Sequence, residues 1–153
     1  MTVFRLHQRA EIPTPTSDRP GQFDIKACLD LGSKVSYHNN VNKENSVPVR
    51  VINGNVCVQV YPAQRVTIPT GLIFDIPEGH ILRLMSTANV TLKKGLVIVD
   101  GTGIINPHSG EAFVTLHNIS DTPAVINDGE SIALGMLEQV LVYDITETSE
   151  RPS

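Results

Sequence analysis

Residues 83–111 read RLMSTANVTLKKGLVIVDGTGIINPHSGE, and this stretch decides the fold. Its apolar runs are short, and each one ends in a polar or glycine-rich segment. These segments are the patch Ser86–Asn89, the Lys-Gly pair at 94–95 and the glycine-rich tip at 101–103. Short apolar runs with this punctuation are typical of strands joined by tight turns. The stretch therefore predicts strand, polar patch, turn, strand, hairpin tip and strand, in that order.

The rest of the chain has the same punctuation. The segment 131–142 begins SIALGML, for which a short helix is the alternative, although Gly135 weakens it. Residues 32–46 are polar and rich in asparagine, which favours a long exposed loop. Many short strands at regular spacing predict an all-β barrel or sandwich. Strands are expected at residues 3–6, 23–29, 47–52, 55–61, 66–68, 72–76, 81–85, 96–99, 112–118, 124–126 and 131–142.

Length and composition bound the class of protein. A chain of 153 residues makes one domain, expected at residues 1–145 and followed by a polar tail at 146–153. The net charge of −4 argues against a chain-wide electrostatic grip on nucleic acid. No apolar run approaches the ~20 residues that cross a membrane. The N-terminus lacks the apolar region of a signal peptide, so a cytoplasmic or virion location is expected rather than secretion.

The two cysteines, Cys28 and Cys57, are too few for a disulfide framework, and their spacing is not that of a zinc site. They are expected to be small buried side chains in a reducing compartment.

Framework segments at several places carry a family resemblance. They are PGQFDI at 20–25, VTIPTG at 66–71, IPEG at 76–79, the ends of the 103–111 segment, and LHN with GESIA between 116 and 133. In this order and spacing they resemble the trimeric deoxyuridine triphosphatases (dUTPases), whose fold is shared by the deoxycytidine triphosphate deaminases. The resemblance implies a dUTPase-like distorted β-barrel or jelly roll that forms a homotrimer and exchanges its C-terminal strand between subunits. The trimer interface is then expected at Ile132, Leu134, Met136, Leu137 and Val140.

The resemblance also implies a reaction, in which water and a bound magnesium ion hydrolyse the bond between the α- and β-phosphates of dUTP. The family's metal-binding aspartate in its first motif matches Asp24. The Arg-Ser-Ser of the second motif matches Thr87, Ala88 and Asn89, so an arginine and a hydroxyl that bind phosphate are lost. Hydrogen bonds from arginine to phosphate are among the strongest in proteins, so this loss weakens the expected site.

The other motif positions are altered too. The water-orienting aspartate of the third motif matches Asn106, and His108 stands near the place of a sugar-packing tyrosine in a segment that is one residue short. The glutamine of the fourth motif matches Leu134, and the glycine-rich C-terminal arm matches residues 145–153, which contain no glycine. An amide cannot act as the carboxylate base. The deaminase branch lacks its glutamate as well, since His117 follows Thr115-Leu116.

The cations considered as replacements for the lost phosphate ligands are Arg65, Arg83, Lys93 and Lys94. They lie at turns and strand ends, which are not typical of a pocket.

Three functions are compatible with this pattern. The main interpretation is a non-catalytic homotrimeric structural or binding module without a cofactor, with a viral capsid decoration protein on threefold axes as one use. Its partners would be itself and a larger assembly, not nucleic acid or membrane. The first alternative is a divergent dUTP pyrophosphatase that holds magnesium through Asp24. The second alternative is a regulator that binds a nucleotide without turnover.

Overall fold

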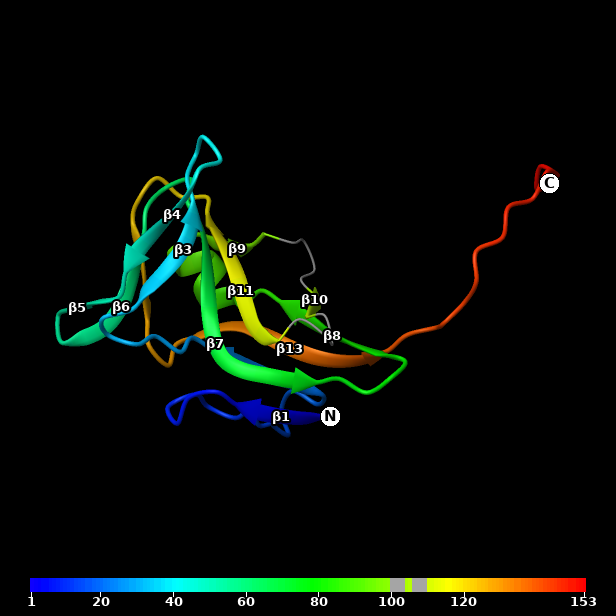
Figure 1. Ribbon diagram of the computed structural model, residues 1–153, viewed down its shortest axis with the longest axis horizontal. Helices are drawn as coiled ribbons and strands as arrows, with labels where there is room; N and C mark the ends of the chain where they lie inside the picture. Colours follow the sequence, from blue (N-terminus) through cyan, green and yellow to red (C-terminus); the bar gives the residue numbers. More distant parts are fainter. Residues whose placement is uncertain (100–103, 106–109) are drawn as a thin grey trace.

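The computed structural model of the protein describes residues 1–99, 104–105 and 110–153. It confirms the all-β fold class (Figure 1). The first sheet has the strand order β4-β3-β7-β11-β9, and β1 pairs with the second half of β7. The second sheet has the order β10-β8-β13-β2. The small third sheet has the order β12-β6-β5. The elements in chain order are β1 (Thr2–Arg5), β2 (Gln22–Lys26), β3 (Lys34–His38), β4 (Glu44–Pro48), β5 (Arg50–Ile52), β6 (Asn55–Val60), β7 (Arg65–Asp75), β8 (His80–Met85), the short π-helix η1 (Asn89–Lys93), β9 (Leu96–Ile98), β10 (Ile104–Ile105), β11 (Glu111–Asn118), β12 (Ala124–Asn127) and β13 (Ser131–Gln139).

The apolar faces of the sheets meet in one core. The rings of Phe23 on β2 and Phe74 on β7 stack with centroids 6.3 Å apart, so the second sheet packs directly against the first. Burial of each large side chain of this kind contributes about 1.5–3 kcal/mol to folding. The largest fully buried side chains include Ile25, Leu29, Ile68, Leu72, Leu82, Leu96, Leu116, Ile126 and Ile132.

Strand β7 corrects the expectation of two separate strands at 66–68 and 72–76. The strand continues past Pro69-Thr70-Gly71 through an irregularity, in which Gly71 takes a φ of +68° and the register with β11 shifts. The buried Thr70 hydroxyl donates to the Ala112 carbonyl at 2.7 Å. The result is one long bent strand that pairs with β3 at one end and with β1 at the other.

The segment 32–46 is not a long loop, and that prediction is wrong. Strands β3 and β4 form a hairpin there, with Val35 buried on the core side. The Asn39 side chain accepts hydrogen bonds from the backbone N–H groups of Val41 and Lys43, each at 3.0 Å, and so closes the turn. The asparagines signalled this tight turn, and the alternation of Val35 and Tyr37 signalled the strand.

One further difference concerns a helix, and the strand expected at residues 131–142 is confirmed over residues 131–139. The helix η1 at Asn89–Lys93 lies where only a polar patch was expected. Residues 131–139 form strand β13 and not the alternative helix, since Leu134 and Met136 fall on one face while Ala133 and Gly135 are buried on the other. In the described part of the chain Cys28 and Cys57 are buried and unpaired, as expected.

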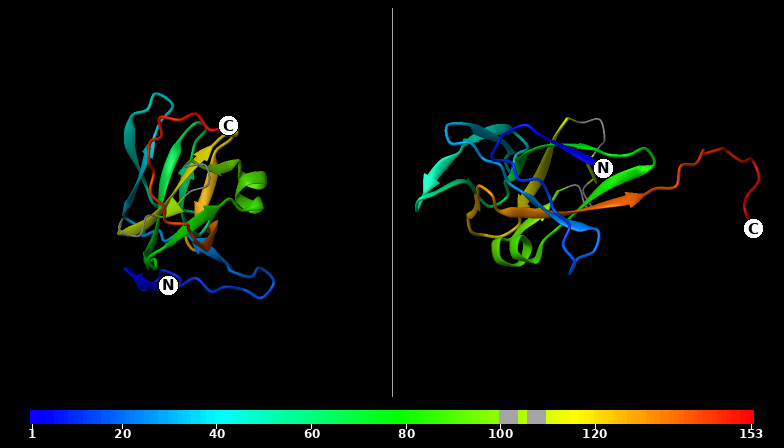
Figure 2. Two further views of the ribbon diagram at one scale, coloured as in Figure 1. Left: turned by 90° about the vertical axis from the view of Figure 1, so that its right-hand side faces the viewer. Right: turned by 90° about the horizontal axis from the view of Figure 1, so that it is seen from below.

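After β13 the chain runs away from the sheets as an extension from Val140 to Ser153, with no strand or helix in it (Figures 1 and 2). Its apolar side chains at Leu141, Val142, Tyr143 and Ile145 are 70–89% exposed. The extension begins before the domain boundary expected at residue 145, and that boundary stays a prediction. No helix in the described ranges is long and apolar enough to span a membrane.

Candidate functional site

The second sheet brings together motif positions that are far apart in the chain. Leu134 on β13 is registered opposite Asp24 on β2 on one side and opposite Met85 on β8 on the other. These side chains share the partly exposed outer face of the sheet, whereas the adjacent residues Phe23 and Leu84 point into the core. The first and fourth motif positions are therefore neighbours, and the strand that leads to the second motif lies beside them.

Two donors hold the Asp24 carboxylate in place. The Ser131 hydroxyl donates to Oδ1 at 2.8 Å, and the Arg19 guanidinium donates to Oδ2 at 3.1 Å. The side chains of Arg19 and Asp24 are 38% and 35% exposed, so the pair can be reached from solvent. Asp24 is thus a positioned carboxylate on an accessible face.

Arg19 was missed by the sequence reasoning. It ends a turn closed by the hydrogen bond from its N–H to the Thr16 carbonyl at 3.3 Å, and the chain then reverses at Pro20-Gly21 into β2. Gly21 takes a φ of +75° in this reversal. The available signal was the Pro-Gly turn, which folds the preceding arginine back toward the start of the strand.

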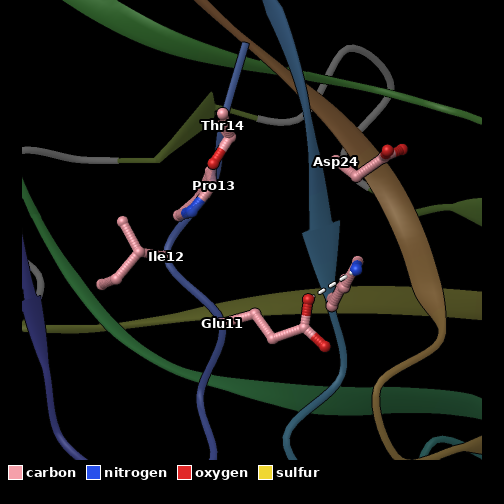
Figure 3. A pocket seen from close by; sticks show the side chains of 6 residues that line it. Glu11, Ile12, Pro13, Thr14 and Asp24 are labelled. Atoms are coloured by element: carbon pink, nitrogen blue, oxygen red, sulfur yellow. Dashed lines mark hydrogen bonds and ion pairs between the residues drawn. The ribbon is translucent and has the colours of Figure 1, made fainter. Parts of the chain in front are cut away.

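A shallow hollow of about 120 Å³ lies beside Asp24. It is lined by Asp24 and Lys26 of β2 and by the segment Glu11–Thr14, which runs alongside β2 (Figure 3). Lys26 Nζ pairs with Glu11 Oε2 at 2.5 Å. The hollow is therefore lined by the carboxylates of Glu11 and Asp24 and by the ammonium of Lys26. The guanidinium of Arg19 contacts Asp24 at its rim.

The second-motif positions supply no cation. Thr87 uses its hydroxyl to accept a hydrogen bond from the Val90 N–H at 3.2 Å, and its carbonyl accepts one from the Thr91 N–H at 3.0 Å. Both bonds lie at the start of η1, whose N-cap residue is Ala88, and Ala88 and Asn89 are exposed at the surface. The third-motif positions Asn106 and His108 lie outside the described residues.

The four cations considered as replacements lie away from Asp24 in the described contacts. Arg65 Nη2 donates to the Asn39 carbonyl and to Asn42, and Lys93 is exposed on η1. Arg83 pairs with Glu138 at 2.8 Å, which raises the pKa of Arg83 and lowers that of Glu138. None of these contacts places a cation beside Asp24.

Lys94 joins η1 to the start of β13. Its Nζ donates to the Val125 carbonyl at 2.6 Å and pairs with Glu130 Oε1 at 2.5 Å. The two side chains are only 22% and 16% exposed. Since Glu130 precedes Ser131, this pair ties the helix to the strand end that holds Asp24.

The residues expected at a trimer interface divide into two sets. Ile132 is fully buried in the core of its own chain, whereas Leu137 packs against that core and is only partly buried. Leu134 and Met136 lie on the outer face of the second sheet, and Val140 is partly exposed where the extension starts.

Among the described residues there is no group of three or more His, Cys, Asp or Glu side chains that would form a metal cage. Magnesium usually keeps several waters and binds through one or two carboxylates together with substrate phosphates. The accessible carboxylate of Asp24 fits that mode of binding, and a protein cage is not required.

Similarity to characterised proteins was found at the level of sequence. No protein-family model matches the chain. The deoxyuridine 5'-triphosphate nucleotidohydrolase of Hydrogenobaculum sp. is 33% identical over 94 residues, which cover 61% of this chain and 65% of the relative. The protein of the same name from Aquifex aeolicus is 39% identical over 77 residues, which cover 50% of this chain and 51% of the relative. The chain thus matches between half and two thirds of the length of these relatives.

Solved structures show the same fold. A dUTPase from Streptococcus mutans has a TM-score of 0.66 at 18% identity, with 92% of this chain and 93% of that chain covered. A mutant dUTPase from phage phi11 of S. aureus, described with a structural Mg(II) ion, has a TM-score of 0.74 at 18% identity, with 99% and 98% covered.

These comparisons contradict the main interpretation from the sequence, a non-catalytic structural module. The curated relatives carry the name of a nucleotide-hydrolysing enzyme at 28–39% identity, which favours the first alternative. The non-catalytic interpretation gave too much weight to the lost motif side chains, and the cations considered as their replacements, Arg65, Arg83, Lys93 and Lys94, did not include Arg19.

Proposed function

Because the chain belongs to the dUTPase superfamily by sequence similarity and by fold, we propose that it hydrolyses dUTP to dUMP and pyrophosphate. The observation that carries the proposal is the 33–39% identity to curated dUTP nucleotidohydrolases. The arrangement of the second sheet supports it, since Asp24 lies in one row with the fourth-motif position Leu134.

Asp24 is the residue proposed to hold magnesium together with the substrate phosphates. Its Oδ1 already accepts a hydrogen bond from Ser131, which orients the carboxylate on the outer face of the sheet. A bound magnesium ion would polarise the phosphoryl oxygens and offset part of the triphosphate charge. The protein's own contribution is the fixed position of this carboxylate.

In the proposed reaction a water oxygen bonds to the α-phosphorus, and the bond from that phosphorus to the α,β-bridging oxygen breaks. Pyrophosphate leaves with the bridging oxygen, and the attacking water passes one proton to the solvent. Asn106 is an amide and cannot take that proton. We therefore expect turnover about 10²–10⁴-fold slower than in a relative with a carboxylate base at this position.

We also propose that the protein is a homotrimer in which the extension after β13 lies against a neighbouring subunit. Its support is the row of apolar side chains at Leu141, Val142, Tyr143 and Ile145, which are 70–89% exposed in the single chain. Exposed apolar segments of this length usually mark a protein contact. Light scattering on the full chain and on a chain ending at Gln139 tests this: the full chain should have three times the monomer mass and the shortened chain should not.

The activity is tested by pyrophosphate release from dUTP with magnesium, with dCTP and dTTP for comparison. Asp24→Asn keeps an acceptor for Ser131 but removes the charge, so it should reduce turnover at least 100-fold with little change in thermal stability. Asp121→Asn is the matched control, since Asp121 is an exposed carboxylate in the turn before β12. Absence of pyrophosphate release from all three nucleotides at high enzyme concentration would refute the proposal.

A further inference from the structure

We propose that Arg19 binds the phosphate groups of the substrate and supplies the guanidinium that the second-motif position Thr87 lacks; this rests on the proposed function. The observation behind it is the 3.1 Å contact between Arg19 Nη2 and Asp24 Oδ2. Arg19 reaches this place from the turn before β2.

In the metal-free site the charge balance favours a cation at this point. A triphosphate that approaches Asp24 meets a carboxylate, and the neighbouring Lys26 is already paired with Glu11. Without Arg19 the group would carry a net negative charge and repel the substrate. With Arg19 beside it, the Asp24 carboxylate is neutralised before any ligand arrives.

Arg19 also keeps capacity for a second partner. A guanidinium has five N–H donors in a planar fork, and the contact with Asp24 uses one nitrogen of Arg19. The side chain is 38% exposed, so phosphate oxygens can reach the other donors. Phosphate binding by such a fork is commonly bidentate, which adds both strength and orientation.

Two other arginines that form ion pairs in the described part of the chain do so away from Asp24. Arg9 pairs with Asp30 and with Asp128, where it joins the N-terminal segment to the loops beyond β2 and β12. Arg83 pairs with Glu138 near the far end of β13. Arg19 differs from both because its partner, Asp24, is itself the proposed ligand of the substrate complex.

The inference predicts selectivity for the phosphate chain over the nucleoside. Arg19→Ala should weaken binding of dUTP and of inorganic tripolyphosphate about 10- to 100-fold and leave deoxyuridine binding unchanged. Arg19→Lys should restore only part of the affinity, because lysine keeps the charge but not the fork. Arg5→Ala is the matched control, since Arg5 is an exposed arginine on β1.

A second measurement separates phosphate binding from mere support of Asp24. In EDTA, Asp24→Asn frees the Arg19 guanidinium from its carboxylate, so tripolyphosphate should bind more tightly than to the wild type. The double variant Arg19→Ala/Asp24→Asn should lose that gain. If Arg19 only positions Asp24, removal of the carboxylate will raise the affinity equally in the single and the double variant.

Calorimetry with tripolyphosphate, dUTP and deoxyuridine on the full chain, together with thermal melts of each variant, gives all of these results. Equal affinities of wild type and Arg19→Ala for tripolyphosphate, an equal loss in Arg5→Ala, or no tripolyphosphate binding by the wild type would each overturn the inference. The two proposals fail differently. Arg19-dependent tripolyphosphate binding without dUTP turnover removes only the activity, whereas turnover with an unchanged KM in Arg19→Ala removes only the role of Arg19.

Discussion

The Lys94–Glu130 pair gives the sharpest stability prediction. Lys94→Met keeps the length of the side chain but removes the ammonium that contacts Glu130 Oε1 and the Val125 carbonyl. Glu130 is only 16% exposed, and its Oε2 is buried with no hydrogen-bond partner in the described part of the chain. The variant therefore leaves a largely buried carboxylate with no ionic partner and frees a backbone carbonyl.

The expected magnitude follows from that burial. Removing one member of a fully buried ion pair costs about 3–5 kcal/mol. The 22% exposure of Lys94 and 16% exposure of Glu130 let water compensate in part, so we expect Lys94→Met to lower the free energy of unfolding by about 2–4 kcal/mol. Adding Glu130→Gln removes the unpaired charge. The double variant should therefore be more stable than the sum of the single effects by at least ~1 kcal/mol.

Urea denaturation followed by circular dichroism measures these differences, at one fixed protein concentration because association shifts the midpoint. Lys93→Met is the control, because Lys93 is the last residue of η1, directly before Lys94, and its side chain is exposed. It should change the free energy of unfolding by less than about 0.5 kcal/mol. Equal effects of Lys93→Met and Lys94→Met, or strict additivity in the double variant, would refute the reasoning.

Three further predictions concern the core, the thiols and acid. Gly135→Ala should cost about 1–3 kcal/mol in a urea melt, because its Cβ would lie 2.5 Å from the Phe23 ring; an unchanged midpoint would contradict that packing. Both buried cysteines should react with a thiol reagent only after denaturant is added, and rapid labelling of the native protein would argue against their burial. The hydrogen bond from Arg83 holds the pKa of Glu138 below its ordinary 4.5, so the pair stabilises the folded protein above that pH and the stabilisation is lost as the pH falls. Glu138→Gln should therefore make the free energy of unfolding less dependent on pH in that range. An identical pH profile for the variant and the wild type would count against the pair.

Much of the local structure was predictable because its cause is local. Asn53-Gly54 predicts a tight hairpin turn, and both residues take positive φ, +51° and +79°, between β5 and β6. The alternation around Phe23 and Ile25 predicts a strand with one buried face. The missed hairpin at β3 and β4 shows the limit, since polar residues on its exposed positions outnumber the few that face the core.

The candidate site was predictable only in part. Asp24 and Leu134 were assigned to motif positions by resemblance, and the register of β2 and β13 makes them direct neighbours. Arg19 was not found, because the Pro-Gly turn after it indicates a chain reversal but does not state which side chain the arginine meets. The non-catalytic interpretation was contradicted by the similarity to curated dUTP nucleotidohydrolases, which the loss of motif residues had outweighed.

The sequence itself determined where strands and turns follow one another along the chain, through side-chain alternation and the backbone freedom of glycine and asparagine. It also determined which chemical groups are available. Which groups meet was decided only by the tertiary structure. Ser131 and Asp24 are separated by 107 positions in the chain and yet share a hydrogen bond, because the inward faces of β2 and β13 pack into one core and thereby fix the register of their outward faces.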